Sequence, residues 1–282
     1  MTNGSYDISV AYRIYPGISK QPVVFPGSKL LLAELCLKSF KKSLGKLHVK
    51  IWAILDGCPM SYEKLFLRYF DKKDLVFVRL NGVGNATTFQ KQIEILTEQR
   101  DSDQVYLAED DYLYLPNQIP AMVNFLCSNN DVDFVSPYDH PDYYRLILHQ
   151  GKSLIRAFDN KHWRTVNSTC LTFLTKKSTL VQTREVFETY RGRNFDASIW
   201  LSLTKQKLIN PIAAARFLTE NIMLFKIIVK AWLFCWRQIL FGTKWTIWVP
   251  IPSAATHLER DSLSPTYDWL KILALSKRRM RG

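Results

Sequence analysis

Short apolar runs recur along the first half of the chain, each four to seven residues long. Gly, Asp, Asn or Pro lies near the ends of these runs, a pattern that is typical of buried strands bounded by turns. The runs cover residues 8–12, 49–55, 75–80, 105–108 and 133–136. We therefore expect five strands in this part of the protein.

Between the runs, apolar residues recur every third or fourth position, which is the spacing of one helix face. A pattern that begins near Ser28 places Ala33, Leu37 and Phe40 on the same face. Similar patterns cover residues 61–70, 87–98 and 118–126. Strands that alternate with helices predict an α/β fold, with a mainly parallel sheet and helices on both of its faces.

With 282 residues, 47% of them apolar, the chain can bury a full core. We expect one main unit over residues 1–216 and a helical, basic segment over residues 217–282. The five cysteines are odd in number and form no Cys-x-x-Cys pair, so neither a disulfide framework nor a thiolate zinc site is expected. The first residues lack the features of a secretion signal. These features predict a cytoplasmic protein.

The formal net charge is +13, and residues 221–282 carry +7 of it, from ten Lys and Arg against three Asp and Glu. Residues 221–241 are rich in apolar side chains but include Lys226, Lys230 and Arg237, so a membrane-spanning helix is not expected. Two interpretations remain open. The helix lies in the plane of an anionic membrane, aided by the basic C-terminus, or it packs on the main unit with its lysines in water.

Polar residues follow three of the predicted strands, where ligands of open parallel sheets bind. Three carboxylates after a buried strand favour a bound divalent cation, because they otherwise repel one another. The glycine loop before the third helix would offer backbone amides and a helix N-terminus to a diphosphate. Asp-Gly pairs and glycine loops are also ordinary turns. The candidates are Asp56, Asn81, Gly82, Asn85, Glu109, Asp110 and Asp111.

The order of these motifs resembles that of GT-A fold glycosyltransferases, especially the inverting family 2. In that family an acidic motif holds Mn²⁺ or Mg²⁺ against the diphosphate of a nucleotide-sugar. The segment LAEDDYLY is similar to it, with Glu109 in the first acidic place and Asp111 in the second. The resemblance implies metal ligation by Asp111 and Glu109, contact of Asp110 with the donor, and a nucleobase near Tyr12 and Asp56.

The segment NFDASIWL, residues 194–201, resembles the motif that carries the family's catalytic base, and Asp196 stands in that place. An Asp at a helix start also stabilises the helix without any chemistry. The family often adds a histidine to the metal, and His257 is the matching candidate; a surface or packing role is the alternative.

The resemblance implies transfer of a sugar from a UDP-sugar, or from a GDP- or dTDP-sugar, to a glycan or lipid-linked acceptor in envelope polysaccharide or glycolipid synthesis. It also implies an enzyme peripheral to the inner face of a membrane. Other classes remain open: a sugar nucleotidylyltransferase, or another metal-dependent phosphate-ester enzyme. A nucleic-acid partner is not expected, since the charge is concentrated in the tail and no binding motif accompanies it.

Overall fold

The structure is a computed structural model that describes residues 5–18, 21–208 and 221–281, with side chains up to residue 276. Its centre is a nine-stranded mixed sheet in the order β3-β2-β1-β4-β9-β6-β10-β8-β7. The first four of these strands in that order run parallel to one another, as do β6 and β10. The strands are β1 Ile8–Ile14, β2 Val49–Asp56, β3 Leu75–Leu80, β4 Gln104–Glu109, β6 Phe134–Val135, β7 Ile155–Phe158, β8 Lys161–Val166, β9 Phe173–Lys176 and β10 Ile247–Ile251.

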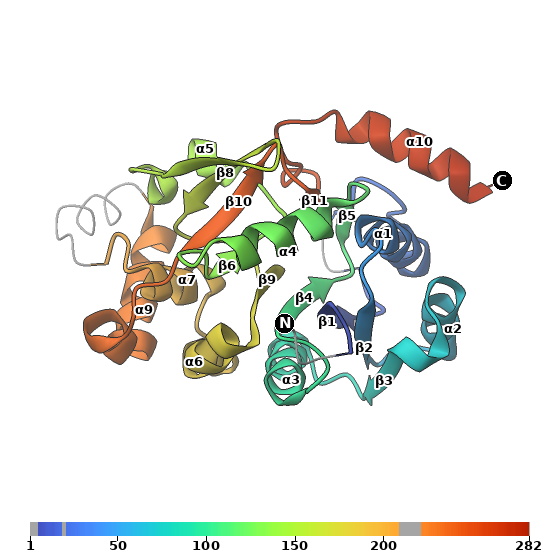
Figure 1. The fold of residues 1–282 in the computed structure, drawn as a ribbon, viewed down its shortest axis with the longest axis horizontal. Coiled ribbons are helices and arrows are strands. Elements are labelled where there is room, and N and C mark those ends of the chain that lie inside the picture. The colour runs from blue at the N-terminus through green and yellow to red at the C-terminus, as the bar shows by residue number, and fades with distance from the viewer. Residues whose placement is uncertain (1–4, 19–20, 209–220, 282) are drawn as a thin grey trace.

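Helices cover both faces of this sheet, as Figure 1 shows. One apolar cluster joins the first face to α1 Lys29–Ser43, α2 Met60–Tyr69 and α4 Gln118–Ser128. A second cluster joins the other face to α3 Asn85–Glu98, α6 Lys177–Glu188 and α7 Asp196–Thr204. The α/β fold, the five strands and the four helices predicted from the sequence are therefore confirmed, with boundaries shifted by a few residues.

The last part of the chain differs from the helical segment that the sequence predicts. Its described residues, 221–281, form two helices, α9 Ile222–Phe241 and α10 Trp269–Arg281, but also two strands. One of them, β10, lies inside the central sheet between β6 and β8. The other, β11 Ala255–His257, pairs with β5 Tyr112–Tyr114 in a small second sheet. Residues 221–281 are therefore connected to the main fold through β10 and β11 and are not purely helical.

Helix α9 packs against α7 through one face only. Its buried positions lie on that face, and they are Leu224, Ile227, Ile228, Ala231, Cys235 and Ile239. The backbone is kinked at Cys235, whose φ and ψ of −126° and 21° are not helical. Packing on the main unit, one of the two interpretations of this segment, is thus confirmed for the inner face. None of the described helices could cross a membrane.

Candidate active site

The acidic residues occupy the turn that joins β4 to β5. Glu109 ends β4, and Asp110 and Asp111 form the turn before β5 begins. Strand β11 runs antiparallel to β5, so that His257 stands opposite Tyr112, and the Leu258 amide donates to the Asp111 carbonyl at 2.8 Å. The pairing of β5 with β11 thus brings His257 next to Asp111, although the two residues are 146 positions apart in the sequence.

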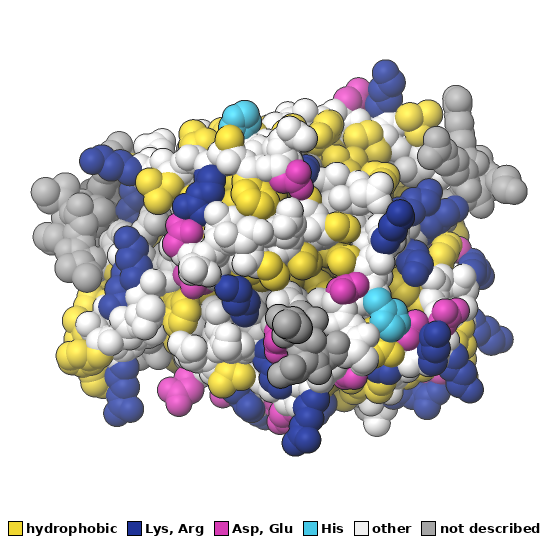
Figure 2. All heavy atoms as spheres, viewed as in Figure 1, with side chains coloured by type: hydrophobic (Ala, Val, Ile, Leu, Met, Phe, Trp, Pro, Cys, Tyr) yellow, Lys and Arg dark blue, Asp and Glu magenta, His cyan; other side chains and the backbone are white. Residues whose placement is uncertain are grey.

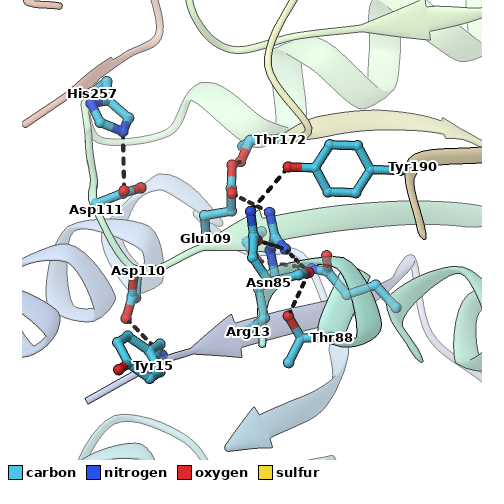
Figure 3. A network of polar contacts seen from close by, with 12 residues as sticks. Arg13, Tyr15, Asn85, Thr88, Glu109, Asp110, Asp111, Thr172, Tyr190 and His257 are labelled. Carbon is cyan, nitrogen blue, oxygen red and sulfur yellow. Dashed lines mark hydrogen bonds and ion pairs between the residues drawn. The ribbon is translucent and has the colours of Figure 1, made fainter. Parts of the chain in front are cut away.

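The carboxylate of Asp111 and the imidazole of His257 face each other, with Oδ2 and Nε2 3.0 Å apart (Figure 3). The other oxygen, Asp111 Oδ1, is buried and has no hydrogen-bond partner. Burial is the largest single effect on the pKa of Asp111 and acts to raise it, but the charge and hydrogen bond of His257, together with the charges of Lys29 and Arg13, lower the pKa to about 2. A buried carboxylate oxygen without a donor, beside an imidazole, fits a divalent cation such as Mn²⁺.

Glu109, in contrast to Asp111, has hydrogen-bond partners for both of its carboxylate oxygens. One of its oxygens accepts a hydrogen bond from Arg13, and the other accepts from Thr172 at 2.8 Å. Figure 3 shows the side chain between these two partners. Within residues 5–18, 21–208 and 221–281, no three His, Cys, Asp or Glu side chains converge on one metal position. The structure therefore brings together Asp111 and His257 of the predicted metal ligands, but not Glu109.

Arg13 is the centre of a polar network that the sequence motifs do not reveal. Its guanidinium donates to the side chain of Asn85 and, at 3.0 Å, to the Asn85 carbonyl. The Asn85 amide in turn donates to the Tyr190 hydroxyl at 3.0 Å. The one available signal in the sequence was a charged residue next to a mainly apolar run. In the structure Arg13 lies within β1 and is only 7% exposed.

Asp110 forms a buried ion pair with Lys29 at the start of α1, with 2.8 Å between the charged atoms. Its second oxygen accepts from the Tyr15 amide at 3.3 Å. Burial raises the pKa of Asp110 to about 6, although Lys29 acts against that rise. Both oxygens thus hold the turn in place, and donor contact by Asp110 stays a prediction.

The glycine loop after β3 does not offer its amides in the way that the sequence predicts. The Asp56 carboxylate accepts from the amides of Val83 at 2.8 Å and Gly84 at 2.9 Å. Gly84 adopts a φ of +86°, which favours glycine. A diphosphate cradle is not supported for these two amides, because Asp56 already occupies them. Asn81 and Gly82 remain exposed at the tip of the loop.

The predicted contacts of Tyr12 and Asp56 with a nucleobase are not supported either. The Tyr12 side chain is fully buried on the opposite side of β1 from Arg13, where its ring packs on Phe40 and Phe66. Asp56 is 1% exposed. Side chains alternate between the two faces of a strand, so Tyr12 belongs to the core, whereas its neighbour Arg13 faces the site.

Asp196 is the first residue of α7, as the sequence predicts for this motif. Its carboxylate accepts from the Ala197 amide at 2.7 Å. Burial raises the pKa of the Cys170 thiol, and the negative charges of Asp196, Glu109 and Asp111 raise it further. All three carboxylates therefore lie within electrostatic range of this thiol. The role of Asp196 as a base stays a prediction.

No protein-family model matches the sequence, and no curated protein does. Several solved structures are similar. The galactosyltransferase LgtC, in complex with donor and acceptor sugar analogues, has 10% identity and a TM-score of 0.45 over 96% of this chain and 95% of its own. The mannosyltransferase PcManGT from Pyrobaculum calidifontis, with GDP-Man and Mn²⁺, has 12% identity and a TM-score of 0.42 over 73% of this chain and 53% of its own.

A cytidylyltransferase from Leptospira borgpetersenii is also similar, with 13% identity and a TM-score of 0.34 over 64% of either chain. Two of these three structures are thus glycosyltransferases and one is a nucleotidyl-transferring enzyme. At such identities, similarity concerns the fold and does not extend to the activity, the substrate or the metal.

Proposed function

We propose that the chain is a metal-dependent, inverting glycosyltransferase. It would move a sugar from a nucleotide-sugar to a hydroxyl group of a glycan or lipid-linked acceptor, in envelope polysaccharide or glycolipid synthesis. The observation that carries the proposal is the pairing of Asp111 with His257 beside a buried carboxylate oxygen that has no partner. We assign Asp196 to the same site as the candidate base; the assignment is supported by the negative charges of Asp196 and Asp111, which both raise the pKa of the Cys170 thiol.

A divalent cation held by Asp111 and His257 would stabilise the negative charge of the departing nucleoside diphosphate. Arg13 and Glu109 neutralise each other and keep Asn85 and Tyr190 in place at the edge of the same site. Asp196 would accept the proton of the acceptor hydroxyl as it attacks the sugar. A single displacement from the opposite side inverts the anomeric configuration and needs no enzyme nucleophile.

The donor class is tested by thermal unfolding with UDP-, GDP- and dTDP-sugars, each with Mn²⁺, with Mg²⁺ and with a chelator. We expect one nucleotide series, UDP in the first place, to raise the melting temperature by about 5 °C or more when metal is present. A ligand at a hundred times its dissociation constant stabilises by about 2.7 kcal/mol, and each kcal/mol shifts the melting temperature of a chain this large by about 2 °C or more. Equal melting curves with all donors would contradict the proposal.

We also propose that the outer face of α9 lies on an anionic membrane, at its inner, cytoplasmic side. This face is opposite the buried one and is apolar along its length. Its residues and their exposed fractions are Ile222 57%, Val229 46%, Leu233 68%, Trp236 45%, Leu240 50% and Phe241 80%. Lys226 and Arg237 are exposed beside it. Figure 2 shows apolar and basic side chains together at this end of the molecule.

The basic residues of the tail do not all join this surface. Lys230 turns back to the main unit, where its ammonium lies 3.8 Å from the centre of the Phe195 ring and donates to the Arg193 carbonyl. Helix α10 lies at the opposite end of the molecule from α9 (Figure 1). The proposed membrane contact therefore depends on the apolar side chains of α9, with Lys226 and Arg237 as its nearest charges.

Replacing Leu233 and Trp236 together with Glu is expected to weaken sedimentation with phosphatidylserine-containing vesicles about 100-fold. The expected loss follows from the roughly 1.5 to 3 kcal/mol that burial of one large apolar side chain contributes. The matched control replaces Leu67 and Val181 together with Glu; these two side chains lie on other helices and are 44% and 50% exposed. If both double variants sediment like the original chain, α9 is not a membrane surface.

A further inference from the structure

A polar cavity of about 310 Å³ lies apart from the acidic turn. It is formed by the end of β8, by the short 3-10 helix η2 Ile147–His149 with the residues that follow it, and by the chain just after α7. Its volume is at the lower end of the range for small-molecule sites. The side chains that matter are His149, Gln150, Lys152, Arg164, Asn167 and Gln206.

Amide and imidazole groups are prominent in this lining, and two of them, His149 and Asn167, are held by hydrogen bonds. His149 Nδ1 lies 2.6 Å from Asn167 Oδ1, and the Asn167 amide donates to the Leu148 carbonyl at 2.6 Å. Burial lowers the pKa of His149, which favours its neutral form. Side chains that both donate and accept suit a ligand with many hydroxyl groups, such as a sugar, and are unsuited to a lipid chain.

The cavity also carries a surplus of positive charge. Lys152 and Arg164 line it, and the ammonium of Lys207 reaches the Gln150 carbonyl beside it. The Asp139 carboxylate forms an ion pair with the Arg164 guanidinium at 2.8 Å. It also accepts a hydrogen bond from the Tyr144 hydroxyl at 2.6 Å. Arg164 Nε is buried and has no hydrogen-bond partner. Three cations thus face two carboxylates, Asp139 and Asp142, the second of which acts on His149, so a net positive charge remains to attract an anion.

Helix α7 connects the cavity with the candidate active site, because Asp196 lies at one end of this helix and the cavity lies at the other. Gln206 lies two residues beyond α7, and the Thr204 hydroxyl at the end of that helix donates to the Asn167 carbonyl at 3.1 Å. Since Asp196 begins this nine-residue helix, a rise of 1.5 Å per residue places the cavity about 13 Å from the candidate base. Such a distance suits a part of the ligand that does not react.

We propose that this cavity binds an acidic sugar unit, one that carries a carboxylate or a phosphate group. Hydroxyl groups would be held by the amide side chains and the acidic group by Lys152. We further assign this unit to the acceptor, away from its reacting hydroxyl. The second assignment rests on the proposed glycosyltransferase function, whereas the binding of an acidic sugar does not.

Titration calorimetry of the full chain with glucuronate and with glucose 6-phosphate tests the cavity. Glucose and inorganic phosphate serve as matched probes that carry only the hydroxyls or only the charge. We expect both acidic sugars to bind at least 10-fold more tightly than either probe. Lys152→Gln should weaken their binding about 10-fold or more, because a charged hydrogen bond is lost. Lys244→Gln, at an exposed lysine after α9, should change nothing.

Absence of binding by both acidic sugars would overturn the proposal, as would equal affinities of the Lys152→Gln and Lys244→Gln variants. Phosphate that binds as tightly as glucose 6-phosphate would show a bare anion site and overturn the sugar assignment. Metal and nucleotide-sugar binding is measured on the same preparations. If acidic sugars bind but no nucleotide-sugar does, the cavity stands and the glycosyltransferase proposal fails.

Discussion

Asp111→Asn is expected to abolish the metal-dependent rise in melting temperature with nucleotide-sugar and to lower turnover about 1000-fold. The substitution keeps the shape of the side chain but removes the charge that a divalent cation requires. Loss of one group that stabilises developing charge commonly costs about 100- to 1000-fold in turnover. Sugar transfer, or hydrolysis of the donor by water, is measured together with thermal unfolding in Mn²⁺.

The matched control is Asp71→Asn, since Asp71 is exposed and makes no capping hydrogen bond with its side chain. His257→Gln should act in the same direction as Asp111→Asn, because His257 faces the same carboxylate. Full turnover in Asp111→Asn would show that the acidic turn holds no catalytic cation, and the Asp111–His257 pair would then be a structural contact.

Asp196→Asn is expected to lower sugar transfer about 100- to 10,000-fold while metal-dependent donor binding stays unchanged. This range is the usual contribution of a positioned general base. Asp196 lies in the first turn of α7, so Asn keeps its size and removes only a charge–dipole contribution of about 0.3 to 1 kcal/mol, which is small beside the expected loss of transfer. We would measure the rate of sugar transfer and the metal-dependent affinity for the donor on the same preparation, so that a loss of proton transfer can be told from a loss of donor binding. Unchanged transfer would leave Asp196 with a helix-stabilising role only.

Much of the fold follows from the apolar pattern, because β1 and β4 are almost continuously buried apolar runs and β2 and β3 beside them are also rich in apolar residues. Strand β10 was missed for a physical reason: Pro250 and Pro252 interrupt the segment, and proline usually argues against a central strand. The small sheet of β5 and β11 was missed because three-residue strands carry no periodicity. Strand β10 pairs with β6 and β8, and β11 pairs with β5, and all of these partners lie far away in the sequence.

The location of the site was predictable, whereas the partners of its side chains were not. Polar residues that follow parallel strands share one edge of the sheet, and Asp111 lies at that edge after β4, while its role in metal binding stays a prediction. Strand order, however, decides that Arg13 lies beside Glu109 in register across β1 and β4. The same holds for Lys29, which folding brings to Asp110. A local pattern does not contain such long-range pairings.

The most direct test of the account is anomalous X-ray scattering from crystals soaked with Mn²⁺ and UDP. The account predicts a manganese peak within bonding distance of the Asp111 carboxylate and the His257 imidazole, with a diphosphate oxygen on the same ion. Manganese bound elsewhere, or a diphosphate bound with no ion between it and Asp111, would contradict the central claim.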